Sequence, residues 1–265
     1  MITSPTNPKL RYVRRLDQAA FRAREGRLLL EGVRLIGDAV GAGIDPSFVL
    51  VAGSAEAMDR TATLRERLAA RGVPVLEVEP RLLAEVAQTQ TSQGILAVAP
   101  LPDLPMPVIP GLVLVVDGLR DPGNLGTLLR SAAAAGVDAV LLGPGTVDSS
   151  NPKVVRAAMG AHFRVPICAL GWAEIAEIVR RPVRPLRAWV ADVSGALDYT
   201  AVDWTAPSAL IVGGEAHGPS PEARALADAT VRIPMPGPVE SLNAATAGAV
   251  VLFEAVRQAS ARQVG

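Results

Sequence analysis

Three short, mainly apolar runs, each ending at a glycine, limit the fold of this 265-residue chain more than any other feature. They cover residues 112–118, 138–143 and 208–213. A strand without alternating polar residues is buried on both faces, as in a parallel sheet covered by helices. The Ala- and Leu-rich stretch 122–136, which ends at Gly136, predicts the first of those helices.

The same pattern continues toward the C-terminal end. Residues 187–191 and 230–233 are predicted strands, and a final helix is expected over residues 241–261. Alternating strands and helices predict an α/β fold with an open parallel sheet, in which ligands bind at the carboxyl ends of the strands.

The first hundred residues predict a separate, smaller α/β domain. Residues 100–111 contain five prolines, so this segment cannot be helical and is expected to be an extended linker. We therefore expect domains at 1–100 and 111–265, joined by a linker at 101–110. Within the first domain, apolar segments alternate with helix-like stretches. The apolar segments are 48–52, 73–78 and 94–99, and the helix-like stretches lie near 7–20, 31–42, 55–71 and 80–87.

Composition excludes several classes of protein. One cysteine, Cys168, and two histidines, His162 and His217, rule out an internal disulfide and a Cys- or His-rich metal site, so no metal is expected. No apolar run reaches the ~18 residues of a membrane span, and residues 1–16 lack the apolar stretch of a signal peptide. The sequence predicts a soluble cytoplasmic protein with no membrane partner.

Basic residues are concentrated at the start of the chain. The formal net charge is 0, but residues 1–34 contain eight basic and three acidic residues. Most of the basic residues are arginines, whose planar fork suits bidentate contacts with phosphate. The segment is either the solvated face of a helix or an RNA-binding surface, and charge alone does not separate the two.

Several familiar motifs are missing. The sequence has no P-loop and no G-x-S-x-G turn. A dinucleotide-binding G-x-G-x-x-G also fails, because Asp148 stands where the third glycine after Gly143 and Gly145 is required. What remains is three glycine- and asparagine-bearing turns, each directly after a predicted strand.

Each of these turns has an ordinary structural explanation. In the first, Asn124 can cap the following helix, and Arg130, about 240° further round that helix, can be a surface arginine. The second, which carries Glu215, can be a plain strand-to-helix turn. In the third, Ser241 or Asn243 can cap the last helix.

Together and in this order, the turns resemble the three motifs of the SpoU (TrmH-like) family of RNA ribose 2′-O-methyltransferases, within the SPOUT superfamily. The N-x-G-x-x-x-R motif matches residues 124–130, and the third motif matches 233–235 with 241–243. The N-E-x-x-G motif matches 214–218, with Gly214 in place of the usual Asn. Residues 151–161 resemble the segment between the first two motifs. The first domain is similar, more loosely, to the substrate-binding domain of many members.

The resemblance implies a fold, a cofactor and a set of site residues. The fold is a parallel-sheet SPOUT domain with a deep trefoil knot, and the cofactor is S-adenosyl-L-methionine. Catalytic roles are implied for Arg130, Asn124, Glu215, Ser241 and Asn243. Cofactor-binding roles are implied for Leu142, Gly143, Ile211, Val212, Gly213, Gly218, Ile233, Met235, Leu242 and Ala247. RNA-binding roles are expected for Asn7, Lys9, Arg22, Arg24, Arg27 and Arg156.

The implied reaction methylates a ribose 2′-hydroxyl in structured RNA. Since an arginine is a poor base, Arg130 is expected to act electrostatically beside the target hydroxyl and phosphate, with the other polar residues orienting it and the ribose. A homodimer through the C-terminal domain is also implied. The extra first domain favours ribosomal RNA as the substrate. The alternatives are a tRNA substrate, a catalytically inactive RNA-binding or ribosome-assembly protein, and an unrelated nucleotide-binding enzyme.

Overall fold

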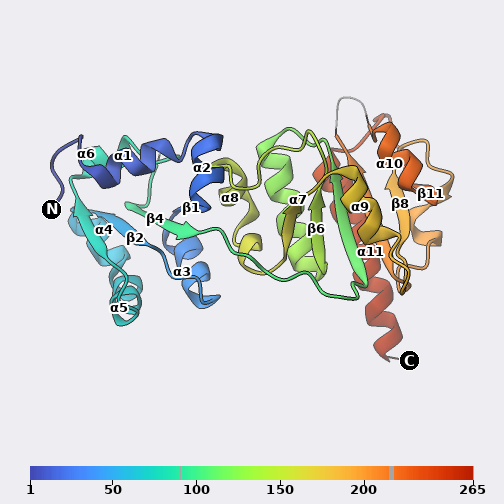
Figure 1. Cartoon of the computed structure of the whole chain (residues 1–265), viewed down its shortest axis with the longest axis horizontal. Helices are drawn as coiled ribbons and strands as arrows, with labels where there is room; N and C mark the ends of the chain where they lie inside the picture. Colours follow the sequence, from blue (N-terminus) through green and yellow to red (C-terminus); the bar gives the residue numbers. More distant parts are fainter. Residues whose placement is uncertain (90, 215–217, 265) are drawn as a thin grey trace. The chain divides into compact units, whose positions relative to one another are not determined.

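The computed structural model describes residues 1–89, 91–214 and 218–264, which form two compact units (Figure 1). The first unit comprises Met1–Asp103 and Asp148–Phe163, and the second comprises Leu104–Val147 and Arg164–Gly265. We expected residues 148–163 in the second domain, but their contacts group them with the first. The reason is apolar packing, because Val155 and Phe163 belong to the same buried cluster as Leu28 and Leu30.

The first unit is built on a four-stranded mixed sheet with the order β1-β4-β2-β3 in the described residues. Strand β4 is antiparallel to both β1 and β2, while β2 and β3 are parallel. The strands are β1 (Arg27–Glu31), β2 (Phe48–Ala52), β3 (Val75–Val78) and β4 (Ile95–Pro100). Strand β1 was not expected, since a five-residue run with three leucines has no periodicity that separates a strand from a helix.

Short helices cover this sheet and form its apolar cores. They are α1 (Pro8–Arg15), α2 (Ala19–Glu25), α3 (Val33–Gly41), α4 (Ala55–Arg60), α5 (Ala62–Ala70), α6 (Pro80–Ala84) and, from the later segment, α8 (Pro152–Ala158) with the 3-10 turn η1 (Ala161–Phe163). Helix α8 packs against β1. The leucines of β1 alternate between two buried clusters, so both faces of this sheet are covered.

The second unit contains the predicted parallel sheet. Its order is β7-β6-β5-β10-β8-β11-β9 within the described residues, and all of its pairings are parallel, which confirms the α/β fold class. The strands are β5 (Leu112–Asp117), β6 (Ala139–Leu142), β7 (Ile167–Ala169), β8 (Arg187–Ala191), β9 (Leu197–Asp198), β10 (Ser208–Gly213) and β11 (Ala229–Arg232). Strands β5, β6 and β10 are the three apolar runs of the sequence.

Helices pack on both faces of this sheet. They are α7 (Pro122–Ala135), α9 (Trp172–Val179), α10 (Pro221–Leu226) and α11 (Ala244–Val264), with a 3-10 turn η2 (Tyr199–Ala201). Side chains of α9 and α10 share one buried cluster with Ile211 of β10, while α11 packs against α7 and β10. Gly248 of α11 makes that approach close, because a Cβ there would lie 2.5 Å from Leu128 Cδ1 of α7. None of the described helices is long and apolar enough to cross a membrane.

Candidate functional site

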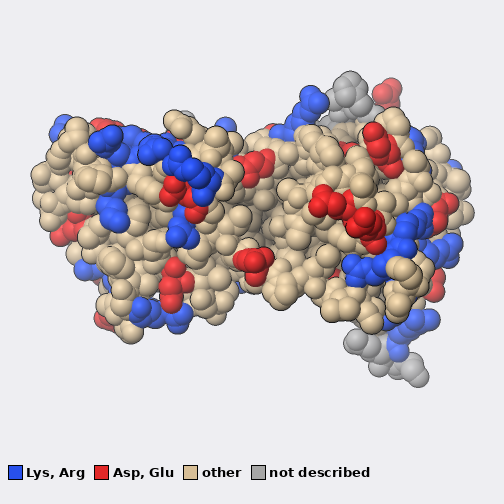
Figure 2. Space-filling view, viewed as in Figure 1, with Lys and Arg blue, Asp and Glu red and all other residues tan. Residues whose placement is uncertain are grey.

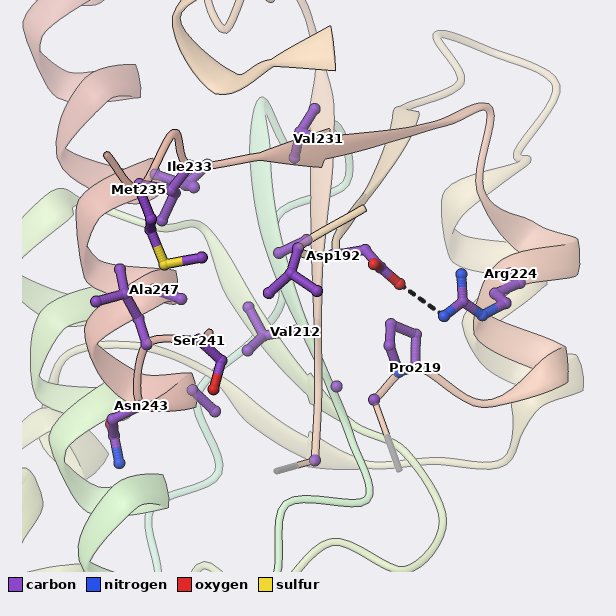
Figure 3. Close-up of a pocket in the computed structure, with 18 residues that line it drawn as sticks. Asp192, Val212, Pro219, Arg224, Val231, Ile233, Met235, Ser241, Asn243 and Ala247 are labelled. Atoms are coloured by element: carbon purple, nitrogen blue, oxygen red, sulfur yellow. Dashed lines mark hydrogen bonds and ion pairs between the residues drawn. The ribbon is translucent and has the colours of Figure 1, made fainter. Parts of the chain in front are cut away.

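A cavity of about 570 Å³ opens at the carboxyl ends of β8, β10 and β11, next to the start of α11 (Figure 3). We call it the β10–α11 cavity. Its volume lies within the roughly 300–1,000 Å³ of small-molecule sites in proteins. Apolar side chains and glycine backbone dominate its lining, with a few polar groups that include Ser241 and Asn243. Its position is the one expected for a ligand site in an open parallel sheet.

Seven of the residues expected to hold the cofactor line this cavity. The turn after β10 supplies part of the wall, and the loop after β11 together with the first turns of α11 supplies the rest. The second and third motifs, which are distant in sequence, therefore meet at one site. The seven residues are Val212, Gly213, Gly218, Ile233, Met235, Leu242 and Ala247.

The other three expected cofactor residues do not line the cavity. Leu142 and Gly143 lie at the end of β6. In the sheet, β5 separates β6 from β10, whereas the cavity lies toward β8 and β11 on the other side of β10. Ile211 faces the opposite way from Val212, because neighbouring side chains of a strand point to opposite faces. Ile211 is fully buried in the cluster beneath α9 and α10.

Two glycines, one at the end of β10 and one directly after it, bring backbone segments into close contact. A Cβ on Gly213 would lie 2.6 Å from the backbone nitrogen of Pro219, and one on Gly214 would lie 2.7 Å from the carbonyl oxygen of Gly118. Both distances are shorter than real Cβ contacts, and both involve backbone atoms. The turns that follow β5 and β10 thus approach each other closely at Gly214, where the family's motif usually has Asn.

An asparagine pair joins the first and third motifs. Nδ2 of Asn243 donates to Oδ1 of Asn124 at 2.9 Å. Oδ1 of Asn243 accepts the backbone N–H groups of Ala245 and Thr246, at 3.0 and 3.2 Å. Asn243, not Ser241, therefore caps α11. Each asparagine fixes the side-chain position of the other at the edge of the cavity.

The cap of α7 differs from the expectation for Asn124. Asp121 is the cap residue, and its Oδ1 accepts the backbone N–H of Asn124 at 2.8 Å. Asn124 itself lies in the first helical turn, which leaves its side chain available to Asn243. The physical reason is that Pro122 occupies the first helical position, where its missing N–H costs nothing.

Arg130 lies on α7 but is not among the described residues that line the β10–α11 cavity. Asn124 and Arg130 are both helical, so they are separated by about 9 Å along the axis and about 240° around it. The Arg130 side chain is exposed. Within one chain, the structure therefore brings Asn124, Ser241 and Asn243 together without Arg130. Glu215, the remaining expected catalytic residue, lies outside the described residues.

The sequence analysis did not single out a charged pair in the cavity wall. Oδ2 of Asp192 accepts from Arg224 at 2.6 Å (Figure 3). Oδ1 of Asp192 accepts from the backbone and hydroxyl groups of Ser194. Burial favours a higher pKa for Asp192, but the hydrogen bonds from Ser194 and Arg224 outweigh it and hold the pKa below its ordinary value. The available signal was the position of Asp192 directly after the predicted strand 187–191.

In the first unit, Arg22 does not face solvent. It is 3% exposed, and its Nη2 contacts Asp148 Oδ2 at 2.6 Å. Nη1 donates to the carbonyl oxygens of Leu16 and Asp17, and Nε donates to Ser150. With these donors engaged inside the unit, Arg22 holds the segment that begins at Asp148 rather than offering a contact to RNA.

Other basic residues of the first unit do face solvent. Lys and Arg side chains gather over α1 and α2 in Figure 2. The guanidinium groups of Arg15 and Arg24 lie 4.0 and 4.9 Å from the ring centre of Phe21, and the ammonium of Lys9 lies 4.2 Å from that of Phe48. Stacking on aromatic rings orders these cations while leaving them exposed.

The remaining expected RNA contacts are less open. Asn7 caps α1 by accepting the backbone N–H of Lys9 at 2.9 Å. Arg27 is half-buried at the start of β1. Arg156 is also half-buried, and its Nη1 is buried without a hydrogen-bond partner in the described part of the chain. In those same residues no group of three or more His, Cys, Asp and Glu side chains is placed to hold a metal ion.

Comparison with known families gives a match in each unit. Residues 111–253 match the SpoU rRNA Methylase family. Residues 7–97 match the MRM3-like substrate binding domain. The two matches cover nearly the whole chain, and the boundary between them falls in the proline-containing segment.

Individual relatives match over both units. The human protein "rRNA methyltransferase 3, mitochondrial" is 35% identical, over 91% of this chain and 70% of its own length. The Bacillus subtilis "23S rRNA (guanosine(2553)-2'-O)-methyltransferase RlmP" is 29% identical, over 95% and 97%. The crystal structure of the SpoU methyltransferase AviRb from Streptomyces viridochromogenes in complex with AdoMet aligns with a TM-score of 0.85 at 31% identity, covering 96% of this chain and 98% of that one.

Proposed function

The chain belongs to the SpoU rRNA methylase family, and from that premise we propose that it transfers a methyl group from S-adenosyl-L-methionine to a ribose 2′-hydroxyl of ribosomal RNA. One observation carries the proposal: the residues of the second and third motifs line one cavity, in a chain with the fold of a relative crystallised with AdoMet.

The β10–α11 cavity suits this cofactor. The close backbone packing at Gly213 and Gly214 leaves main-chain groups, not side chains, at the turn, and main-chain N–H and C=O groups suit an adenine edge. Val212, Ile233 and Met235 supply apolar surface for the rings. When bound, the cofactor supplies a methyl group already activated by its positive sulfur.

With an activated methyl group, the protein has to align the hydroxyl and ease the loss of its proton. Asn243 and Asn124, fixed by their mutual hydrogen bond, present amide groups beside the cavity and orient the ribose. Ser241 adds a hydroxyl in the same wall. Arg130 stabilises the negative charge that develops on the ribose oxygen, because a guanidinium remains protonated and does not serve as a base.

Arg130 acts in a homodimer, reaching the cavity of the partner chain. Two observations support this arrangement. Arg130 is exposed and does not line its own β10–α11 cavity. The helix α11, which packs against α7, leaves the side chain of Phe253 48% exposed, and this apolar surface is available to a partner chain.

Ribosomal RNA is favoured over tRNA as the substrate. The human and Bacillus subtilis relatives, which match across both units, are named as rRNA methyltransferases, and the first unit matches a substrate-binding domain of its own. The exposed cations over α1 and α2 would contact the RNA backbone. The trefoil knot and the cytoplasmic location expected from the sequence remain predictions.

The proposal is tested by incubating the protein with methyl-labelled cofactor and total RNA from a strain that lacks it, then mapping the labelled nucleotide. Label on a 2′-O-ribose of ribosomal RNA is expected. Label confined to tRNA would overturn the choice of substrate. Calorimetric binding of S-adenosyl-L-methionine without methyl transfer to any RNA would identify a binding protein instead of an enzyme. Preference for ATP or NAD would overturn the proposal entirely.

The dimer is tested by mixing two inactive variants, Arg130→Ala and Ser241→Ala. If Arg130 acts across the dimer, mixed dimers regain one intact site and activity returns. If Arg130 acts within its own chain, both sites of a mixed dimer stay defective and mixing restores nothing. Light scattering of the separate and mixed proteins confirms that dimers are present.

A further inference from the structure

We propose that a second cavity of this unit receives one nucleotide of the RNA substrate, and that Arg120 contacts its phosphate. This inference rests on the proposed function. The cavity measures about 400 Å³ and is lined by the turn after β5, by Pro144 and Gly145, and by Gly214 and residues 218–221 after β10. We call it the β5–β10 cavity.

The two cavities lie on opposite sides of the end of β10. In the sheet, β10 has β5 on one side and β8 on the other. The β10–α11 cavity uses the β8 and β11 side, whereas the β5–β10 cavity uses the β5 and β6 side. They share three lining residues, Gly214, Gly218 and Pro219. The proposed nucleotide site is therefore adjacent to the proposed cofactor site.

The walls of the β5–β10 cavity leave room for a planar group. Gly118, Gly145 and Gly218 have positive φ angles of 68°, 80° and 63°. A Cβ would meet no atom closer than 3.8 Å at Gly118 and Gly145, and none within 4 Å at Gly218. Since glycine exposes its backbone at such positions, a base or ribose can approach these main-chain groups directly.

The charged side chains of the β5–β10 cavity determine which part of a nucleotide can enter it. Asp117 is 4% exposed, and its Oδ2 accepts the backbone N–H of Ser220 at 2.6 Å. Asp121 is exposed, and its Oδ1 accepts the N–H of Asn124. Two carboxylates would repel a phosphate held among them, but they can accept hydrogen bonds from base N–H and ribose O–H groups.

Arg120 is the only cationic side chain among the described residues of this lining, and it is exposed. A phosphate at the mouth of the cavity can pair with its guanidinium while the uncharged base or ribose occupies the interior. The site thus fits a nucleotide within an RNA chain and not a free inorganic anion.

Hydrogen bonds also link the two cavities. Asp121, in the lining of the β5–β10 cavity, accepts from Asn124, and Asn124 accepts from Asn243, in the lining of the β10–α11 cavity. These hydrogen bonds hold the wall of the β5–β10 cavity in place relative to the wall of the β10–α11 cavity. The asparagine pair therefore sits where a ribose hydroxyl would have to be aligned.

The test compares Arg120→Ala with Arg187→Ala. Arg187 is an exposed arginine at the opposite end of β8, so the control removes the same charge from the same unit away from both cavities. The probe is a fluorescent fragment of the ribosomal RNA that the wild-type protein methylates, titrated at several salt concentrations. Cofactor affinity is measured by calorimetry, and methyl transfer at saturating RNA is measured alongside.

For Arg120→Ala we expect RNA affinity about 10-fold weaker and a slope of log affinity against log salt that is lower by about 0.7–0.9, because one phosphate contact is lost. Cofactor affinity and transfer at saturating RNA should stay near wild type, and Arg187→Ala should leave all four quantities unchanged. Arg120→Lys should restore the salt slope.

Wild-type RNA affinity and salt slope in Arg120→Ala would overturn this inference while methylation by the wild type would still support the proposed function. Loss of cofactor binding in that variant would also overturn it, since it would place Arg120 in the structure of the donor site. Absence of methyl transfer by the wild type would refute the proposed function and this inference together.

Discussion

Asn243 Nδ2 donates a hydrogen bond to Asn124 Oδ1 at 2.9 Å, although 119 positions separate the two residues. The same Asn243 side chain caps α11 through its Oδ1. One residue therefore has two separable tasks, which involve different atoms of one amide. Substitutions that alter one atom at a time can distinguish them.

Replacing Asn243 tests this division. Asn243→Ala loses the cap and the Asn124 contact, so we expect about 1 kcal/mol of lost stability and a strong loss of methyl transfer. Asn243→Asp keeps a capping oxygen but has no N–H to donate, so stability should stay near wild type while transfer still falls. Thermal unfolding and transfer to RNA measure the two effects. Full transfer activity in Asn243→Asp would show that the side-chain N–H group of Asn243 has no role in the reaction.

Arg130→Ala should lower methyl transfer about 100-fold or more, because a charge beside the developing oxyanion is lost. Its exposed side chain does not line the β10–α11 cavity, so cofactor affinity should hold and stability should change by less than about 0.5 kcal/mol. Arg130→Lys, which keeps the charge without the fork, should recover only part of the rate. Wild-type turnover in Arg130→Ala would remove this residue from the mechanism.

Restoring the family's usual residue at Gly214 should harm this protein. A Cβ there would lie 2.7 Å from the carbonyl oxygen of Gly118, so Gly214→Asn must push two backbone segments apart. We expect a loss of about 1–3 kcal/mol in stability and weaker cofactor binding. Gly237→Asn is the control, because no atom lies within 4 Å of a Cβ at Gly237. Wild-type stability and cofactor affinity in Gly214→Asn would show that the turn accommodates the side chain without loss of free energy.

Asp148→Asn should destabilise the first unit by about 2 kcal/mol, because it leaves the buried Arg22 guanidinium without its counter-charge. Asp45→Asn is the matched control, since its partner Arg71 is exposed and a surface pair contributes little. Hydrogen exchange of the β1 amides is the suitable measurement, because all three tryptophans lie in the second unit and do not report on the first. Equal effects of the two substitutions would contradict a special role for the Arg22 pair.

The first unit should also lose stability as the pH falls below about 6.5. Burial lowers the pKa of His162, so the folded state resists a proton that the unfolded state accepts. Its contribution is complete above the ordinary histidine pKa and is lost as the pH falls toward the folded value. His162→Gln should flatten the dependence of unfolding free energy on pH between about pH 7 and 5. An unchanged pH dependence of the unfolding free energy in His162→Gln would show that other groups cause it.

Local patterns in the sequence predicted most of the elements of the parallel-sheet unit. The apolar runs at 112–118, 138–143 and 208–213 predicted strands of a parallel sheet, and the stretch 122–136 predicted the helix between the first two. Both follow from periodicity and burial, which depend on neighbouring residues. The proline-rich segment at 100–111 likewise marked the boundary between the two family matches. Strand β1 was not predicted, because five residues are too few to show a hydrophobic period.

The site was predicted less completely, and for a physical reason. Motif spacing indicated that Val212, Ser241 and Asn243 belong together, and they line one cavity. Motif spacing could not show that β5 separates Leu142 from that cavity. The order of strands in a sheet depends on long-range contacts and cannot be predicted from a local sequence pattern.

The sequence by itself determined the class of fold and the three turns that carry the motifs, since each depends on residues close together in the chain. Only the tertiary structure decided that Asn243 contacts Asn124, that Arg22 is buried against Asp148, and that two cavities share the end of β10. The two contacts join residues 119 and 126 positions apart, and their energies depend on distance and burial, which exist only once the chain has folded.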